Sequence, residues 1–139
     1  DKATGAICYR TRDKRLLLAE RSQECRLAEA RPGGNSRCFL FLEPDKKEQL
    51  FAISPDSQKS LPLRGGARYI SYGKGLPFLF SDQGYGILVA SSSPVFSCDL
   101  ASYGTYLHTE GDAQMDYYFI AGKNIHTLLS ACRFLLGKL

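Results

Sequence analysis

Short apolar segments separated by turn-forming residues fill most of this 139-residue chain. Strands interrupted at such short intervals are typical of an antiparallel sandwich rather than of a parallel α/β sheet. We therefore predict one mainly β domain, an antiparallel β-sandwich. The segments that we expect to be strands are residues 6–10, 15–19, 36–42, 49–53, 67–72, 78–80, 85–90, 95–99, 105–108 and 114–121.

The last part of the chain has a different period, which predicts one C-terminal helix over residues 125–136. Asn124 suits the N-cap, because its side chain can accept from free backbone N–H groups, and Gly137 suits a left-handed C′ position. The apolar residues at i, i+3, i+4 and i+7 spacing form one stripe that faces a core. They are Ile125, Leu128, Leu129, Cys132, Leu135 and Leu136.

Turn signals organise the first half of the chain. Residues 11–14 are expected to close a hairpin, residues 31–36 to form a loop, and residues 54–66 a long turn-rich stretch. Aromatic and β-branched residues concentrate after Tyr69, which suggests that the buried sheet lies there.

The net charge of +4 comes from 18 basic and 14 acidic residues, and the basic residues lie mostly at or before Lys74. Acidic residues interrupt them, so solvated loops explain the pattern better than a nucleic-acid site does. No apolar run approaches the roughly 20 residues that cross a bilayer, and the first residues lack the apolar region of a signal peptide. We expect neither a nucleic-acid partner nor a membrane partner.

The five cysteines are an odd number without a C-x-x-C pair, which speaks against a zinc site or a disulfide framework. Each lies among apolar neighbours, where a reduced thiol acts as a small core residue. Free thiols favour a reducing compartment, so the cytoplasm is slightly favoured and the localisation otherwise stays unknown.

No catalytic group stands out. The two histidines, His108 and His126, are not placed beside a nucleophile, so we interpret both as structural or exposed. Asp82 precedes a glycine and suits a turn, while Asp116 suits a polar contact at a sheet edge or domain seam. We expect no metal, because the two histidines are far apart in the sequence. We also expect no cofactor, because no phosphate-binding glycine motif is present.

Three segments in the second half resemble glycoside hydrolase family 31. Residues 76–90 resemble its "P-x-x-x-S-x-x-G-Y-G-ϕ-ϕ" strand pair, residues 116–122 its "D-Y-Y-F-I-x-G" strand, and residues 132–138 the "Y-R-x-L-T-G-K" that ends its next helix. Residues 5–20 look like its early hairpin. The match is good from residue 61 to 139, and looser before that.

One segment departs from the family pattern. Residues 48–54 take the place of "E-x-ϕ-ϕ-G-L-G", and Ala52 and Ser54 replace both glycines. In the family this turn and the loop after it approach the substrate end of the catalytic barrel, so the change weakens the expectation of a standard substrate-rim role. Residues 63–66 still resemble the downstream "L-R-G".

The resemblance implies a galactose-mutarotase-like β-sandwich at residues 1–123 and, at 124–139, a helix leading to a missing catalytic (β/α)8 barrel. The parent would hydrolyse α-glucosides or α-xylosides with retention, through two aspartates of the barrel, so no catalytic residue lies on this chain. The implied partners are that barrel and carbohydrate. The candidates for a substrate-rim contact are Lys59, Arg64 and Arg68.

Two alternatives stay open. A free-standing carbohydrate-binding module would need exposed aromatic rings that stack on sugar faces, for which Tyr69, Tyr72, Tyr85 and Tyr103 are available. The other alternative is a structural interaction domain. A domain that packs on a barrel should instead carry one contiguous apolar patch beside the terminal helix.

Overall fold

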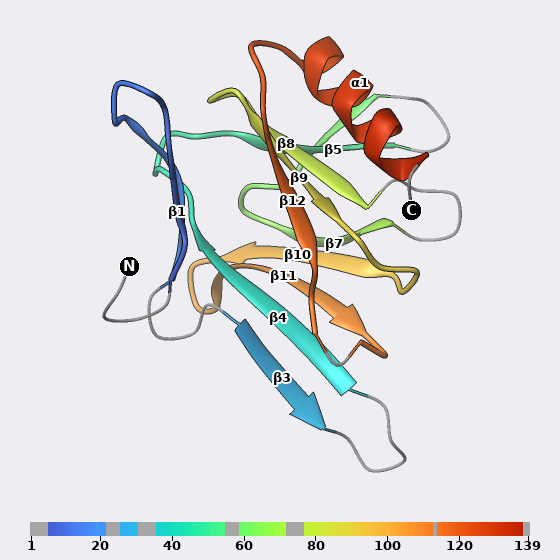
Figure 1. Cartoon of the computed structure of the whole chain (residues 1–139). Helices are drawn as coiled ribbons and strands as arrows, with labels where there is room; N and C mark the ends of the chain where they lie inside the picture. The colour runs from blue at the N-terminus through green and yellow to red at the C-terminus, as the bar shows by residue number, and fades with distance from the viewer. Residues whose placement is uncertain are drawn as a thin grey trace.

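Two antiparallel sheets and one helix build the fold (Figure 1). The computed structural model describes residues 6–21, 26–30, 36–54, 59–71, 77–112 and 114–137. Within these residues the chain forms an antiparallel β-sandwich with a C-terminal helix, so the predicted fold class is confirmed.

The larger sheet, sheet A, has the order β1-β2-β4-β11-β10-β7, and β3 pairs with β4 beside that path. Residues 8–10 and 16–20 form the predicted N-terminal hairpin, whose turn is closed by a hydrogen bond from Thr11 N–H to the Arg15 carbonyl at 2.8 Å. The strands of sheet A are β1 (Cys8–Arg10), β2 (Leu16–Glu20), β3 (Arg26–Ala30), β4 (Ser36–Glu43), β7 (Ala67–Ser71), β10 (Val95–Leu100) and β11 (Gly104–Glu110).

The smaller sheet, sheet B, has the order β12-β9-β8-β5-β6. Its central strands β8 and β9 are buried along their whole length, because sheet A covers one face and the helix covers the other. The sequence predicts a buried sheet in the part of the chain after Tyr69, and the two strands there that are buried throughout are β8 and β9. The strands of sheet B are β5 (Leu50–Ile53), β6 (Ser60–Pro62), β8 (Phe78–Ser81), β9 (Tyr85–Val89) and β12 (Tyr117–Ala121).

Helix α1 (Ile125–Leu136) has the predicted bounds and lies across β8, β9 and β12 in Figure 1. Leu128 and Cys132 are buried against sheet B. The N-cap prediction is confirmed, since the Asn124 side chain accepts from Thr127 N–H at 3.0 Å. The prediction for Gly137 was wrong: its φ of −67° is right-handed, because the last turn simply continues and Gly137 N–H bonds to the Arg133 carbonyl.

Two strands were missed by the sequence analysis. β3 pairs with β4 over five residues, and β6 lies within the stretch predicted to be turns. Pro62 is compatible with β6 because this strand is at the edge of sheet B, where one row of backbone groups needs no strand partner. Residues 31–35 of the loop predicted at 31–36 lie outside the described residues, as do Cys25 and Tyr72, and Ser36 is the first residue of β4.

A buried polar contact joins the first hairpin to the last strand across the sandwich. Glu20 is 2% exposed and accepts from Tyr117 Oη–H at 2.6 Å and from Ile7 N–H at 3.0 Å. Tyr9 donates to the Tyr117 hydroxyl at 2.9 Å, and its ring stacks on Phe119 at 3.8 Å. Burial and the hydrogen bond to Glu20 raise the pKa of Tyr117, so it stays a neutral donor.

Candidate functional site

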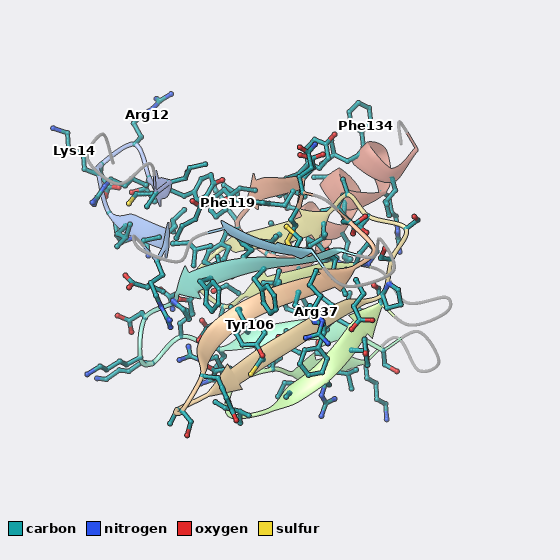
Figure 2. All side chains as sticks on the ribbon, turned by 90° about the horizontal axis from the view of Figure 1, so that it is seen from below. Arg12, Lys14, Arg37, Tyr106, Phe119 and Phe134 are labelled. Atoms are coloured by element: carbon teal, nitrogen blue, oxygen red, sulfur yellow. The ribbon has the colours of Figure 1, made fainter. Side chains whose placement is uncertain are left out.

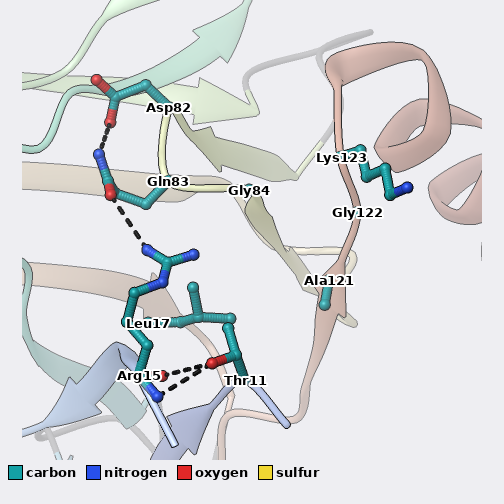
Figure 3. A pocket seen from close by; sticks show the side chains of 9 residues that line it. All are labelled: Thr11, Arg15, Leu17, Asp82, Gln83, Gly84, Ala121, Gly122 and Lys123. Carbon is teal, nitrogen blue, oxygen red and sulfur yellow. Dashed lines mark hydrogen bonds between the residues drawn. The ribbon is translucent and has the colours of Figure 1, made fainter. Parts of the chain in front are cut away.

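Loops from three parts of the chain surround an open cleft of about 520 Å³ at one end of the sandwich (Figure 3). They are the hairpin turn between β1 and β2, the turn between β8 and β9, and the junction of β12 with α1. The lining residues are Thr11, Arg15, Leu17, Asp82, Gln83, Gly84, Ala121, Gly122 and Lys123.

Two glycines bring the resembling motifs together at this cleft. Gly122 N–H donates to the Gly84 carbonyl at 3.0 Å, which ties the end of β12 to the β8–β9 turn. Gly84 has a φ of +90°, and a Cβ there would lie 3.0 Å from the Gly122 oxygen. A side chain at Gly84 would therefore be strained and crowded. The segments that resemble the family motifs thus form one structural unit.

The polar groups of the cleft position its loops. Asp82 accepts from Gln49 N–H at 3.1 Å and from the Gln83 side-chain amide at 3.2 Å, which agrees with the predicted turn role. Arg15 donates to Gln83 Oε1 at 3.5 Å. Arg15 and Lys123 are exposed, so the cleft offers donors and positive charge at an open surface, as suits a contact surface.

The three predicted rim residues do not lie in one place. Lys59 and Arg64 flank opposite ends of β6, and Arg68 is on β7 in the other sheet. Lys59 and Arg68 have exposed side chains, whereas Arg64 is half-buried. The role of these residues at a substrate rim stays a prediction.

Arg64 is the centre of a network that joins three loops and strands. Its Nε donates to Asp99 Oδ2 at 2.9 Å, and its Nη1 donates to the carbonyls of Asp45 at 2.9 Å and Glu48 at 2.6 Å. Asp99 also accepts from Gly65 N–H at 2.7 Å and from the Thr105 hydroxyl at 2.6 Å. These donors compensate a carboxylate that is largely removed from water.

The Asp99 network predicts a loss of stability in acid. Burial favours the neutral acid, but hydrogen bonds from Thr105, Gly65 and Arg64 together lower the pKa of Asp99. A lowered folded-state pKa means that the stabilisation is complete above the unfolded value of about 3.9 and is lost as the pH falls below it. Urea unfolding at pH 6 and pH 3 should show this loss, and Asp99→Asn should reduce the difference between the two pH values. An equal pH dependence in both proteins would contradict it.

A second buried carboxylate lies beneath this network. Glu48 is 1% exposed and accepts from the Ser81 hydroxyl and from Asp45 N–H. Burial and the neighbouring Glu48 raise the pKa of Tyr85, whose side chain is fully buried. The carboxylate is enclosed in the core and holds the β4–β5 loop on β8, which is a structural role.

The tyrosines proposed for sugar stacking differ in exposure. Tyr69 and Tyr103 are 48% and 65% exposed, but Tyr85 is fully buried, so it cannot stack on a sugar. Tyr69 belongs to an aromatic cluster on the outer face of sheet A that sequence reasoning missed. A pocket of about 170 Å³ is lined there by Arg37, Phe39, Tyr69, Phe96, Tyr106 and His108.

The described cysteines Cys8, Cys38, Cys98 and Cys132 are free thiols. The expectation that each is a core residue was wrong for Cys8, which is exposed on the first hairpin. The described residues contain no group of three or more His, Cys, Asp or Glu side chains suited to a metal ion. No helix among them has the length and hydropathy needed to span a membrane.

No family model and no curated protein matches this sequence. Solved structures do match. A family 31 dextranase from Flavobacterium johnsoniae, complexed with isomaltotriose, superposes with a TM-score of 0.66 at 20% identity, over 91% of this chain and 17% of the dextranase chain. A family 31 α-xylosidase from a soil metagenome, complexed with xylose, gives a TM-score of 0.71 at 19% identity, over 87% of this chain and 21% of its own.

A xylosidase from Aspergillus niger gives a TM-score of 0.60 at 15% identity, over 85% of this chain and 18% of that enzyme. This chain thus spans about a fifth of the length of each of these enzymes. It has the fold of a domain of family 31 glycoside hydrolases, as the sequence resemblance predicts.

Proposed function

We propose that this chain is the non-catalytic N-terminal β-sandwich domain of a family 31 glycoside hydrolase. The observation that carries the proposal is the fold match over nearly the whole chain to about a fifth of several such enzymes. In the proposed parent, residues 1–123 form a galactose-mutarotase-like sandwich and residues 124–139 lead to the catalytic barrel.

The proposed partner is that barrel, and the surface that supports it lies around α1. Phe134 is 64% exposed on the helix, and Tyr118 is 40% exposed on β12, the strand that precedes it. Figure 2 shows Phe134 on the outside of the helix. Large apolar side chains at a surface favour burial against another domain. The open cleft with Arg15 and Lys123 adds polar contacts at the β12–α1 junction.

The proposed parent reaction is retaining hydrolysis of α-linked glucosides or xylosides by two carboxylates of the barrel. The similar structures include a dextranase and α-xylosidases, which supports this range of substrates. The sandwich would order the barrel and present a loop near the sugar, with Lys59, Arg64 and Arg68 as the candidate contacts.

The coding sequence after Leu139 tests this proposal. We expect it to continue for the length of a (β/α)8 barrel with two suitably placed aspartates. The longer protein should hydrolyse p-nitrophenyl α-D-glucopyranoside or α-D-xylopyranoside, while residues 1–139 alone should not. A stop codon directly after Leu139, or a continuation without a barrel, would contradict the proposal.

A further inference from the structure

The outer face of sheet A carries a second apolar layer. An antiparallel sheet with one wet face normally alternates between apolar and polar side chains. Here Leu40 and Leu107 face the core, while their neighbours Phe39 and His108 face outward. Outward-facing aromatic residues occur on four neighbouring strands, β4, β11, β10 and β7. This face is therefore suited to binding a ligand rather than to contact with water alone.

The strand register assembles the rings into a continuous row. Phe39 lies opposite His108, His108 opposite Phe96, and Phe96 opposite Tyr69. Ring centroids are 5.1 Å apart for Phe39 and His108, 5.9 Å for His108 and Phe96, and 5.1 Å for Phe96 and Tyr69. A second row beside it contains Tyr106 and Phe41, at 5.4 Å.

The four rings of the first row line a pocket together with Tyr106 and Arg37, and Figure 2 shows Arg37 and Tyr106 on the face that contains it. Its volume of about 170 Å³ is well below the roughly 300–1,000 Å³ of pockets for drug-sized ligands. It therefore suits one ring-sized molecule. Oligomeric ligands would have to extend beyond it across the sheet.

Polar groups stand at the edge of the ring-lined pocket. Arg37 Nε is buried and has no hydrogen-bond acceptor among the residues that the structure describes, and it lies 3.8 Å from Glu110 Oε1. His108 Nε2 lies 3.6 Å from the same Glu110 oxygen. The Arg37 side chain as a whole is 37% exposed and lines the pocket. The pocket thus combines ring faces with a guanidinium group whose N–H donors can bind a ligand hydroxyl.

We propose that this pocket binds a single pyranose ring of a carbohydrate. The C–H face of the sugar stacks on the aromatic rings, and its hydroxyl groups reach Arg37 and Glu110. A nucleic-acid base could also stack, but its backbone would need a basic track, and Arg68 on β7 lies on the opposite face from Tyr69. The inference does not depend on the proposed barrel, because the whole pocket lies on this chain.

Titration of the full 139-residue chain with methyl α-D-glucopyranoside and methyl α-D-xylopyranoside, followed by two-dimensional amide NMR, tests the proposal. We expect shifts confined to β4, β7, β10 and β11, with a Kd in the millimolar range for a ligand this small. Tyr69→Ala and Arg37→Gln should each weaken binding about fivefold or more.

Tyr118→Ala is the matched control. Tyr118 is also a tyrosine on an edge strand and is 40% exposed, compared with 48% for Tyr69, but it lies in sheet B. It should leave binding unchanged, and circular dichroism should show that every variant is folded. Two results would overturn the proposal that this pocket binds a pyranose ring: no amide shifts with either sugar, or amide shifts that persist unchanged in Tyr69→Ala. Neither result would change the test of the coding sequence after Leu139.

Discussion

Replacing Gly86 by valine should lower the free energy of unfolding by about 3 kcal/mol, or roughly 10 °C in Tm. Gly86 lies in β9, between β12 and β8 in sheet B, with the Phe78 ring beside its Cα. A Cβ at Gly86 would lie 2.6 Å from two carbon atoms of that ring and 3.2 Å from the Leu79 carbonyl oxygen. Phe78 is fully buried and packs among the residues that hold α1, so its ring cannot swing into solvent.

Gly66→Val provides the matched control for this experiment. A Cβ at Gly66 meets nothing within 4 Å, and the residue precedes β7 at the surface of the sandwich. Thermal and urea unfolding of both variants should show a small change at Gly66 and a large one at Gly86. Similar losses of unfolding free energy in the two variants would mean that the Phe78 ring moves aside at little cost, which would contradict its tight packing in the core.

Arg64→Ala should destabilise the protein by about 2–3 kcal/mol, because it removes an ion pair and leaves Asp99 with less compensation. The side chains of Arg64 and Asp99 are 21% and 17% exposed. The carbonyl groups of Asp45 and Glu48 lose a donor at the same time. We expect the β4–β5 connection to loosen, because it loses both of these hydrogen bonds and is then held only by other contacts such as the buried carboxylate of Glu48.

Arg68→Ala separates this structural effect from the loss of a charge. Arg68 has an exposed side chain on the edge strand β7. We expect its replacement to change the free energy of unfolding by less than about 0.5 kcal/mol. Urea unfolding at neutral pH measures both variants. Equal effects at the two positions would show that the network around Arg64 contributes little.

The strands that the sequence predicted share a clear pattern, whereas β3 and β6 lack one. β9 and the first three residues of β8 are continuous apolar runs, because both faces of these strands are covered. β3 contains Arg26 and Glu29, and its pairing depends on β4 rather than on its own composition. β6 is three residues long and includes Pro62, so local propensity favours a turn and only the partner strand β5 makes it a strand.

The candidate sites could not be predicted from the sequence alone, because they depend on which distant segments of the chain lie side by side. Arg64 could be named from the resemblance, but its partners lie in segments far along the chain, so its structural role became visible only in three dimensions. The aromatic pocket follows from register. Phe39 and Phe41 alternate with core leucines on β4, and this double-sided pattern was the available signal. Which rings on β7, β10 and β11 would join them depended on the pairing of the strands.

The contact between Glu20 and Tyr117 has a consequence for synthesis on the ribosome. The two residues are 97 positions apart, so at about 5–20 residues per second Glu20 is made roughly 5–20 s before Tyr117. During that interval the hairpin can pair with β4, but its carboxylate lacks the hydroxyl that later compensates its burial. The earliest hairpin of the nascent chain is therefore among the last parts of the sandwich to be completed.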